Sequence, residues 1–150
     1  MSLFRPDASI GFLTTDVSRL IRRAFERELA ASDLPLTVGQ ARTLAYVVAH
    51  AGRRQSALAE RMGIEPMTLV NFLDQLEQLG LVERRPHPSD RRAKTVHTTP
   101  AAEPLLAALD AIAGRVRARV VAGLTPRRVD ALIDTLEHIR DGLTGGEDAS

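Results

Sequence analysis

The stretch "RRPHPSDRRAKTVHTT" (Arg84–Thr99) carries five basic residues and one acid in the middle of the chain. Pro86 and Pro88 exclude a helix at this point, because proline lacks a backbone N–H and clashes with the preceding helical turn. The segments "LVERRP" and "AKTVHTT" instead place successive side chains on opposite sides, as strands do, and "HPSDRR" between them is rich in turn-forming residues. We therefore predict a β-hairpin whose tip carries Arg91 and Arg92.

Two helices are predicted directly before this hairpin. The first, Ser56–Met62, ends at Gly63, since glycine readily adopts the left-handed conformation that terminates a helix. The second begins at Glu65 and Pro66, because proline is tolerated at a first helical position and an acid favours the positive end of the helix dipole. We expect this helix to end at Gly80. Its buried positions are expected to be Leu69, Leu73 and Leu76, with Leu79 as a further candidate.

The outer face of the second helix is polar and uncharged. Two helices joined by a short glycine-containing turn are typical of a helix-turn-helix, whose second helix can enter the major groove of DNA. Neutral amides and hydroxyls at that position hydrogen-bond base edges, whereas on an isolated helix they form an ordinary solvated face. The polar residues at helical spacing are Thr68, Asn71, Gln75 and Gln78.

The hairpin favours the DNA-binding interpretation of that face. A helix-turn-helix followed at once by a basic-tipped hairpin forms a winged helix, in which the helix occupies the major groove and the wing reaches phosphates or the minor groove. The charge distribution agrees, because residues 37–99 hold nine basic and six acidic side chains, whereas residues 100–150 hold six and eight.

Helices are also predicted on the N-terminal side of this region. One helix covers Ser9–Leu29, with apolar side chains on one face and arginines on the other. Thr37 and Gln40 then form a capping-box pattern, which starts a helix that continues to about Ala51 and stops at Gly52. The buried positions of that helix are expected to be Ala41, Leu44, Ala45 and Val48.

Two long helices are predicted after the hairpin, starting at Thr99-Pro100 and Thr125-Pro126. The second repeats apolar residues every three or four positions through Leu143, a seam that needs a partner helix. We therefore expect the N-terminal and C-terminal helices to pack on each other and on a second subunit. The predicted dimerisation residues are Leu13, Val17, Val129, Leu132, Leu136 and Ile139.

The predicted fold class is therefore mainly α with a small β-hairpin wing, in one domain of 150 residues. It comprises an N-terminal dimerisation helix in residues 1–36, a winged helix-turn-helix in 37–99, C-terminal dimerisation helices in 100–143 and a disordered tail in 144–150. The chain has no cysteine, no apolar run suited to a signal peptide and none near the ~18 residues of a membrane span. We expect a cytoplasmic protein that does not enter membranes.

Catalysis and metal binding are not expected. The four histidines are scattered over different predicted elements, and no glycine-rich phosphate loop or nucleophile motif is present. His87, Asp90 and His97 share the hairpin and could in principle meet at a metal, but polar hairpin residues are usually solvated. We therefore predict no catalytic residue, no metal site and no cofactor.

At this point the sequence resembles the MarR family of bacterial transcription regulators, and within it the SlyA-like branch. The resemblance extends from the first helix to Leu143 and is most specific over "GIEPMTLVNFLDQLEQLGLVERRPHPSDRRAKTVHTTPAAEPLL". The D-x-R-x-K signature of the family's wing is present as Asp90, Arg92 and Lys94. The resemblance implies a homodimer that binds a pseudo-palindromic operator in double-stranded DNA, most often as a repressor.

The resemblance also implies roles for individual residues. Met67, Thr68 and Asn71 match the positions that contact bases, Arg91 matches the wing arginine of the minor groove, and Asp90 and Arg92 match residues that brace the tip. The complete predicted DNA-binding set is Ser56, Pro66, Met67, Thr68, Asn71, Gln75, Asp90, Arg91, Arg92 and Lys94.

Two positions depart from the SlyA-like pattern. Asn71 stands where an arginine is usual, which changes the favoured base from guanine to adenine. Thr98-Thr99 replaces the usual Leu-Thr at the end of the wing, which removes an apolar anchor but keeps the cap of the next helix.

The family resemblance further implies a small phenolic or carboxylate effector that weakens DNA binding. Arg22, Arg23, Tyr46 and Phe72 are candidates for its site by placement alone, although exposed arginines on a helix are more often simply solvated. The alternative function is a winged-helix module that binds protein without reading DNA. Such modules often lack basic wing tips and polar recognition faces, and this chain has both.

Overall fold

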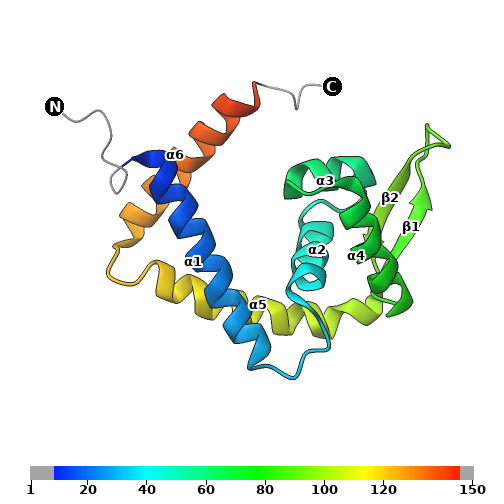
Figure 1. The fold of residues 1–150 in the computed structure, drawn as a ribbon, viewed down its shortest axis with the longest axis horizontal. Helices are drawn as coiled ribbons and strands as arrows, with labels where there is room; N and C mark the ends of the chain where they lie inside the picture. Colours follow the sequence, from blue (N-terminus) through cyan, green and yellow to red (C-terminus); the bar gives the residue numbers. More distant parts are fainter. Residues whose placement is uncertain (1–8, 146–150) are drawn as a thin grey trace. The chain divides into compact units, whose positions relative to one another are not determined.

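A computed structural model describes residues 9–145 (Figure 1). The described residues are mainly helical, with one two-stranded antiparallel sheet, as the sequence predicts. The chain divides into two compact units, residues 1–116 and 117–150. The elements in chain order are α1 (Ile10–Ala30), α2 (Val38–Ala49), α3 (Gln55–Met62), α4 (Pro66–Gln78), β1 (Val82–Pro86), β2 (Lys94–Thr98), a short 3₁₀ helix (Pro100–Ala102), α5 (Glu103–Val120) and α6 (Pro126–Thr144).

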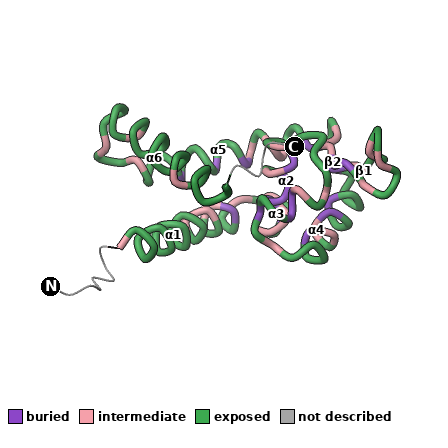
Figure 2. Tube along the Cα trace, turned by 90° about the horizontal axis from the view of Figure 1, so that it is seen from above, coloured by how far each residue is buried: buried purple, intermediate pink, exposed green. Residues whose placement is uncertain are grey.

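The hydrophobic core of the first unit lies among α2, α3, α4 and the hairpin, and it is completed by Leu29 of α1 and by Leu109 and Ile112 of α5 (Figure 2). Each of these elements supplies side chains that are almost completely buried, and burying one leucine or valine contributes about 1.5–3 kcal/mol. These side chains are Leu44, Val47, Leu58, Leu69, Leu73, Leu76, Val82 and Val96. This core fixes the position of α4 relative to α3 and the strands.

The predicted helix ends are confirmed at the turn between α3 and α4. Gly63 is left-handed, with φ 63° and ψ 37°, and directly follows the last residue of α3. Glu65 is the N-cap of α4 and Pro66 its first residue. The capping box of α2 is also present, because the Thr37 hydroxyl accepts from the Gln40 backbone N–H at 3.2 Å while the side-chain Oε1 of Gln40 accepts from the Thr37 N–H at 2.9 Å.

The hairpin pairs Val82 with Thr98 and Pro86 with Lys94, in the predicted segments. Residues before α3 extend this small sheet. Arg54 forms an isolated antiparallel bridge with Thr95, and the Gly52 N–H donates to the Val96 carbonyl at 3.3 Å. The backbone that leads into α3 is therefore bonded to β2 as well as to α2.

The predicted buried face of α2 is only half correct. Ala41 and Leu44 are buried, but Ala45 and Val48 are exposed, whereas Thr43 and Val47 are buried. Thr43 satisfies its hydroxyl within the helix by donating to the Gly39 carbonyl at 2.8 Å, which allows a polar residue in the core. Because Thr43 is polar, a pattern of hydrophobic residues does not predict that it is buried.

The end of α4 also differs from the expectation. Leu79 is 49% exposed, and the core contact passes instead to Leu81, which is buried. The reason is the left-handed Gly80, with φ 72°, which turns the chain after α4 ends at Gln78. α2 likewise ends at Ala49, two residues before the predicted limit.

α6 has no buried residue within the chain, although it carries a regular apolar seam (Figure 2). Thr125 caps its start as predicted, by accepting from the Arg128 N–H. The helix includes Thr144, which we had placed in the tail, and the remaining tail positions 146–150 lie outside the described residues.

Candidate nucleic-acid interface

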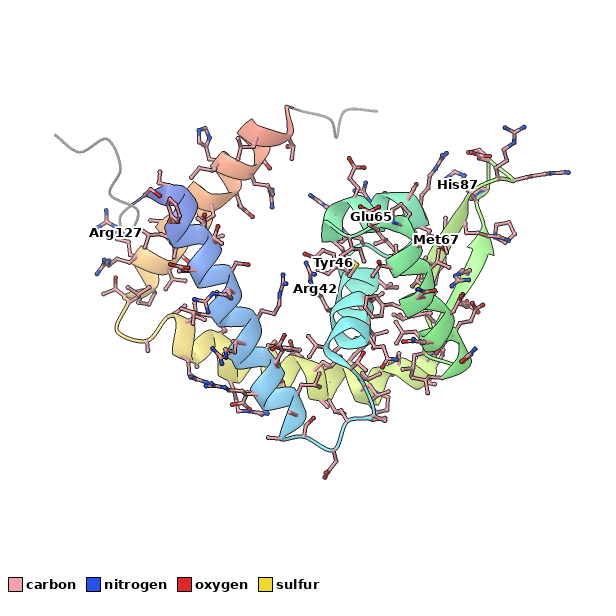
Figure 3. The ribbon with its side chains drawn as sticks, in the orientation of Figure 1. Arg42, Tyr46, Glu65, Met67, His87 and Arg127 are labelled. Atoms are coloured by element: carbon pink, nitrogen blue, oxygen red, sulfur yellow. The ribbon has the colours of Figure 1, made fainter. Side chains whose placement is uncertain are left out.

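The first turns of α4 present an uncharged surface to solvent. Pro66, Met67, Thr68 and Asn71 are all exposed, because Leu69, Leu73 and Leu76 on the opposite face are fully buried. Met67 is 67% exposed, the largest value for any of the large apolar side chains that stand exposed on the winged helix. The predicted base-contacting residues Met67, Thr68 and Asn71 therefore share the exposed N-terminal half of α4, where Figure 3 labels Met67.

The acidic side chains of α4 form ion pairs with an arginine of the hairpin. Pro66–Gln78 contains no lysine or arginine, and its two carboxylates, Asp74 and Glu77, both pair with Arg84 of β1. The Arg84 side chain is only 20% exposed, and its Nη2 also donates to the Val70 carbonyl at 3.4 Å. Arg84 thus compensates the negative charge of α4 and joins that helix to the base of the hairpin.

Asp90 organises the tip of the hairpin. Its Oδ1 accepts from the Arg92 backbone N–H at 3.0 Å, and its Oδ2 lies 3.4 Å from Nη1 of Arg54 at the start of α3. Within the described residues, Asp90 forms no ion pair with the side chain of Arg91 or Arg92. A carboxylate two residues before a turn N–H reaches the backbone more easily than the neighbouring guanidinium, so Asp90 fixes the loop backbone and links it to α3.

The side chains of Arg91 and Arg92 extend into solvent. Both residues are exposed, and within residues 9–145 neither guanidinium forms an ion pair or hydrogen bond. Lys94, at the start of β2, is exposed and unpaired in the same part of the chain. Three cations near one loop without partners are available for an anionic ligand.

An open hollow lies between the hairpin and the beginning of α3. Arg54 and Arg92 contribute guanidinium groups and Lys94 an ammonium group, and the first backbone N–H groups of α3 have no partner within the helix. Groups of this kind suit a backbone phosphate. The hollow is lined by Arg54, Gln55, Ser56, Asp90, Arg92, Ala93 and Lys94.

Gln75 is separated from the other predicted base readers. Its Oε1 accepts from Nε2 of Gln40 at 2.8 Å, which ties it to α2. Gln75 lines a second hollow together with Leu34, Pro35, Leu36, Thr37, Gln40, Gln78 and Leu79. Helical spacing correctly placed Gln75 on the polar side of α4, but it did not indicate that α2 would engage the amide.

Arg54 is the residue of this site that the sequence reasoning missed. Its partner Asp90 is 36 positions away in the chain, so no local pattern connects the two. The only signal was the "RRQ" run directly before α3, in which a basic residue precedes the helix N-terminus.

The four predicted ligand residues lie outside the two hollows described above. Phe72 packs against Gly39, whose missing side chain leaves room for the ring. The Tyr46 ring lies 5.5 Å from the Arg42 guanidinium and 5.9 Å from the His50 ring (Figure 3). Arg22 and Arg23 are exposed on α1, and neither of the two hollows contains any of the four.

Hairpin histidines take part in local hydrogen bonds. His87 Nδ1 accepts from the Ser89 N–H at 3.2 Å, and His97 Nε2 lies 3.0 Å from the Thr95 hydroxyl. Among the described residues, no group of three His, Cys, Asp or Glu side chains could hold a metal ion. In the same part of the chain, no helix combines the length and the hydropathy needed to cross a membrane.

The helix-turn-helix and the basic hairpin define the class of winged-helix proteins. A sequence model of the MarR family matches residues 36–94. The transcriptional regulator PA3341 is 32% identical over 91% of this chain and 99% of its own, with a TM-score of 0.77. A MarR-family regulator from Rhodococcus sp. RHA1 is 29% identical over 92% of this chain and 96% of its own, with a TM-score of 0.78.

CouR from Rhodococcus jostii RHA1, solved bound to p-coumaroyl-CoA, is 27% identical over 89% of this chain and 93% of its own, with a TM-score of 0.75. The chain belongs to the MarR family of transcriptional regulators. No enzyme is among these relatives, in keeping with the absence of a catalytic motif from the sequence.

Proposed function

We propose that this protein regulates transcription, as a repressor, by binding a specific sequence of double-stranded DNA as a homodimer. The proposal rests on one observation: within the winged helix, the unpaired cations and the uncharged base-reading groups lie on different elements. Unpaired cations occupy the hairpin tip, whereas the exposed start of α4 offers hydroxyl, amide and apolar groups without a cation. Phosphate contacts position a protein on DNA, and base-edge contacts specify the sequence.

The proposed contacts follow this separation. Arg91, Arg92 and Lys94 bind the phosphate backbone or the negative minor groove, and Ser56 at the start of α3 binds a phosphate with its hydroxyl and backbone N–H. Pro66, Met67, Thr68 and Asn71 face the major groove, and Asp90 braces the tip. Gln75 contributes through its bond to Gln40, which supports α4 against α2.

A homodimer accounts for the exposed apolar faces of α1 and α6. Leu13 and Val17 of α1, and Leu132 and Leu136 of α6, are each at least 44% exposed in the single chain. With Val129 and Ile139 they would form the dimer interface, so that residues 1–36 and 100–143 serve dimerisation and 37–99 serve DNA binding. A two-fold symmetric dimer binds a pseudo-palindromic operator.

An effector that relieves repression completes the proposal, on the pattern of the SlyA-like branch. CouR, a relative of this chain, was solved with the ester p-coumaroyl-CoA, an aromatic compound. A small aromatic or carboxylate compound at Arg22, Arg23, Tyr46 and Phe72 would couple the dimerisation helix to the winged helix. Titrating such compounds into a protein–operator complex should release the DNA, and a broad set without effect would indicate repression that needs no ligand.

In vitro selection from random DNA duplexes tests the DNA-binding proposal. The full-length protein should enrich two inverted half-sites whose centres lie about one helical turn apart, since each subunit presents one α4. If no sequence is enriched, and if the affinity for DNA does not depend on salt concentration, the alternative of a protein-binding winged helix is favoured.

A further inference from the structure

The Met67 side chain is exposed to solvent in the first turn of α4. Its thioether is at most a weak hydrogen-bond acceptor, so it is poorly suited to recognise bases by hydrogen bonding. Single exposed apolar residues are ordinary on protein surfaces, so its exposure alone decides nothing. Its position is more informative. Met67 and Asn71 are four residues apart in one helix, so both side chains project from the same face, about 6 Å apart along the axis.

This spacing limits the bases that the two side chains can reach together. Base pairs stack about 3.4 Å apart, so contacts made by Met67 and Asn71 fall within about two base pairs of each other. Among the base edges of the major groove, the C5-methyl of thymine is the apolar group, and the Asn amide matches N6 and N7 of adenine. The flexible thioether of methionine adapts its shape to such a contact.

The charges of α4 act against guanine. A guanidinium or ammonium group bound to O6 and N7 is the usual way to select guanine, and Pro66–Gln78 contains neither. Glu65, the N-cap, is exposed and forms no ion pair within the described residues (Figure 3). Its carboxylate can only accept hydrogen bonds, so it cannot supply the donors that O6 and N7 of guanine require.

We propose that α4 reads A·T base pairs, and that Met67 does so by contacting a thymine methyl group within about two base pairs of the adenine bound by Asn71. This inference rests on the proposed function, because it requires α4 to lie in the major groove. It assigns the apolar half of the readout to Met67 and the polar half to Asn71.

Replacing single thymines of the selected operator by deoxyuridine tests the inference, since this removes one methyl group and keeps every hydrogen-bonding group. One thymine per half-site, near the adenine read by Asn71, should show a loss of about four-fold in affinity, the transfer free energy of one methyl group. Met67→Ala should bind the thymine and deoxyuridine duplexes equally. Met67→Leu, which keeps an apolar side chain, should retain the difference.

Leu79→Ala is the matched control, because Leu79 is also an exposed apolar residue but lies at the opposite end of α4. It should retain the full discrimination of the unmodified protein. If deoxyuridine is tolerated at every thymine of an enriched operator, or if Met67→Ala keeps the same loss, the role of Met67 is overturned while the proposed function stands. If selection enriches no sequence, both are overturned.

Discussion

Asn71 places an amide, which both donates and accepts hydrogen bonds, on an exposed helical face, and its neighbours on α4 carry no positive charge that could supply bulk affinity. We therefore expect Asn71→Ala to lose about 1–3 kcal/mol of discrimination at one position per half-site, with binding to unrelated DNA unchanged. Competition titrations with operator duplexes substituted at each position measure this. An equal loss on all DNA would assign Asn71 a structural role instead.

At the residue scale, the features that the sequence predicted are those decided by near neighbours in the chain. The capping box of Thr37 and Gln40, the left-handed Gly63 and the start of α4 at Pro66 each depend on a few adjacent residues. The Arg54–Asp90 pair and the Gln40–Gln75 bond depend on tertiary packing, since their partners are 36 and 35 positions apart. Spacing within one helix cannot indicate such bonds.

At the element scale, two side chains, Arg84 and Asp90, attach the hairpin to neighbouring elements through ion pairs. Arg84 joins its base to α4, and Asp90 joins its tip to Arg54 before α3. Asp90→Ala removes a negative charge that would lie close to phosphates, so electrostatics alone predicts stronger DNA binding. We expect weaker binding, by several-fold, because the tip loses both its backbone cap and its link to α3.

Asp90→Asn separates these two contributions. The amide oxygen can still accept from the Arg92 N–H, but the ion pair with Arg54 is lost, so binding should weaken less than in Asp90→Ala. In an Arg54→Ala background, Asp90→Asn should add no further loss. Both side chains are partly exposed, and such pairs contribute about 0.2–1 kcal/mol to folding, so unfolding temperatures should change little. Stronger binding by both Asp90 variants would reduce Asp90 to a repulsive charge.

Hydrophobic periodicity predicted some buried positions of α2 and α4 wrongly. The pattern predicted the helices of the winged helix and their order, but it chose the wrong side of α2 beyond Leu44, because the buried Thr43 is polar. The pattern also predicted that Leu79 is a candidate core residue. The spacing of apolar residues does not indicate the left-handed backbone conformation of Gly80, which ends this part of the core. In both cases the competing effect is local hydrogen bonding or backbone conformation.

At the scale of the whole molecule, the proposed dimer interface includes the apolar seam of α6, in which Leu132 and Leu136 are each at least 44% exposed. Leu136→Asp places a charge in that seam and should convert a dimer into a monomer with much weaker operator binding, because a buried unpaired charge is costly. Sedimentation at micromolar concentration measures the change. His138→Asp adds the same charge on the opposite side of α6 and should remain dimeric. A compact, stable monomer of the unmodified protein would contradict the dimer.

At this scale too, part of the structure could be predicted from the sequence and part could not. Periodicity predicted α1, α5 and α6, but the helix expected from Thr99-Pro100 begins as a 3₁₀ turn without a side-chain cap from Thr99, and α5 itself starts at Glu103. The ligand residues were less predictable. Gly39 makes room for the Phe72 ring, and the Tyr46 ring lies close to the Arg42 guanidinium and the His50 ring, contacts that spacing along the chain did not indicate.

The salt dependence of DNA binding by Arg91→Ala tests most directly whether the hairpin is a DNA-binding wing. Arg91 has no ion pair within the described residues, so its removal should leave thermal stability unchanged. Each phosphate contact contributes about 0.9 to the slope of log K against log salt concentration, so a dimer that loses two contacts should lower that slope by about two. Specific and non-specific affinity should fall together. If Arg91→Ala and Arg92→Ala both bind DNA with the affinity and salt slope of the unmodified protein, the hairpin is not a DNA-binding wing.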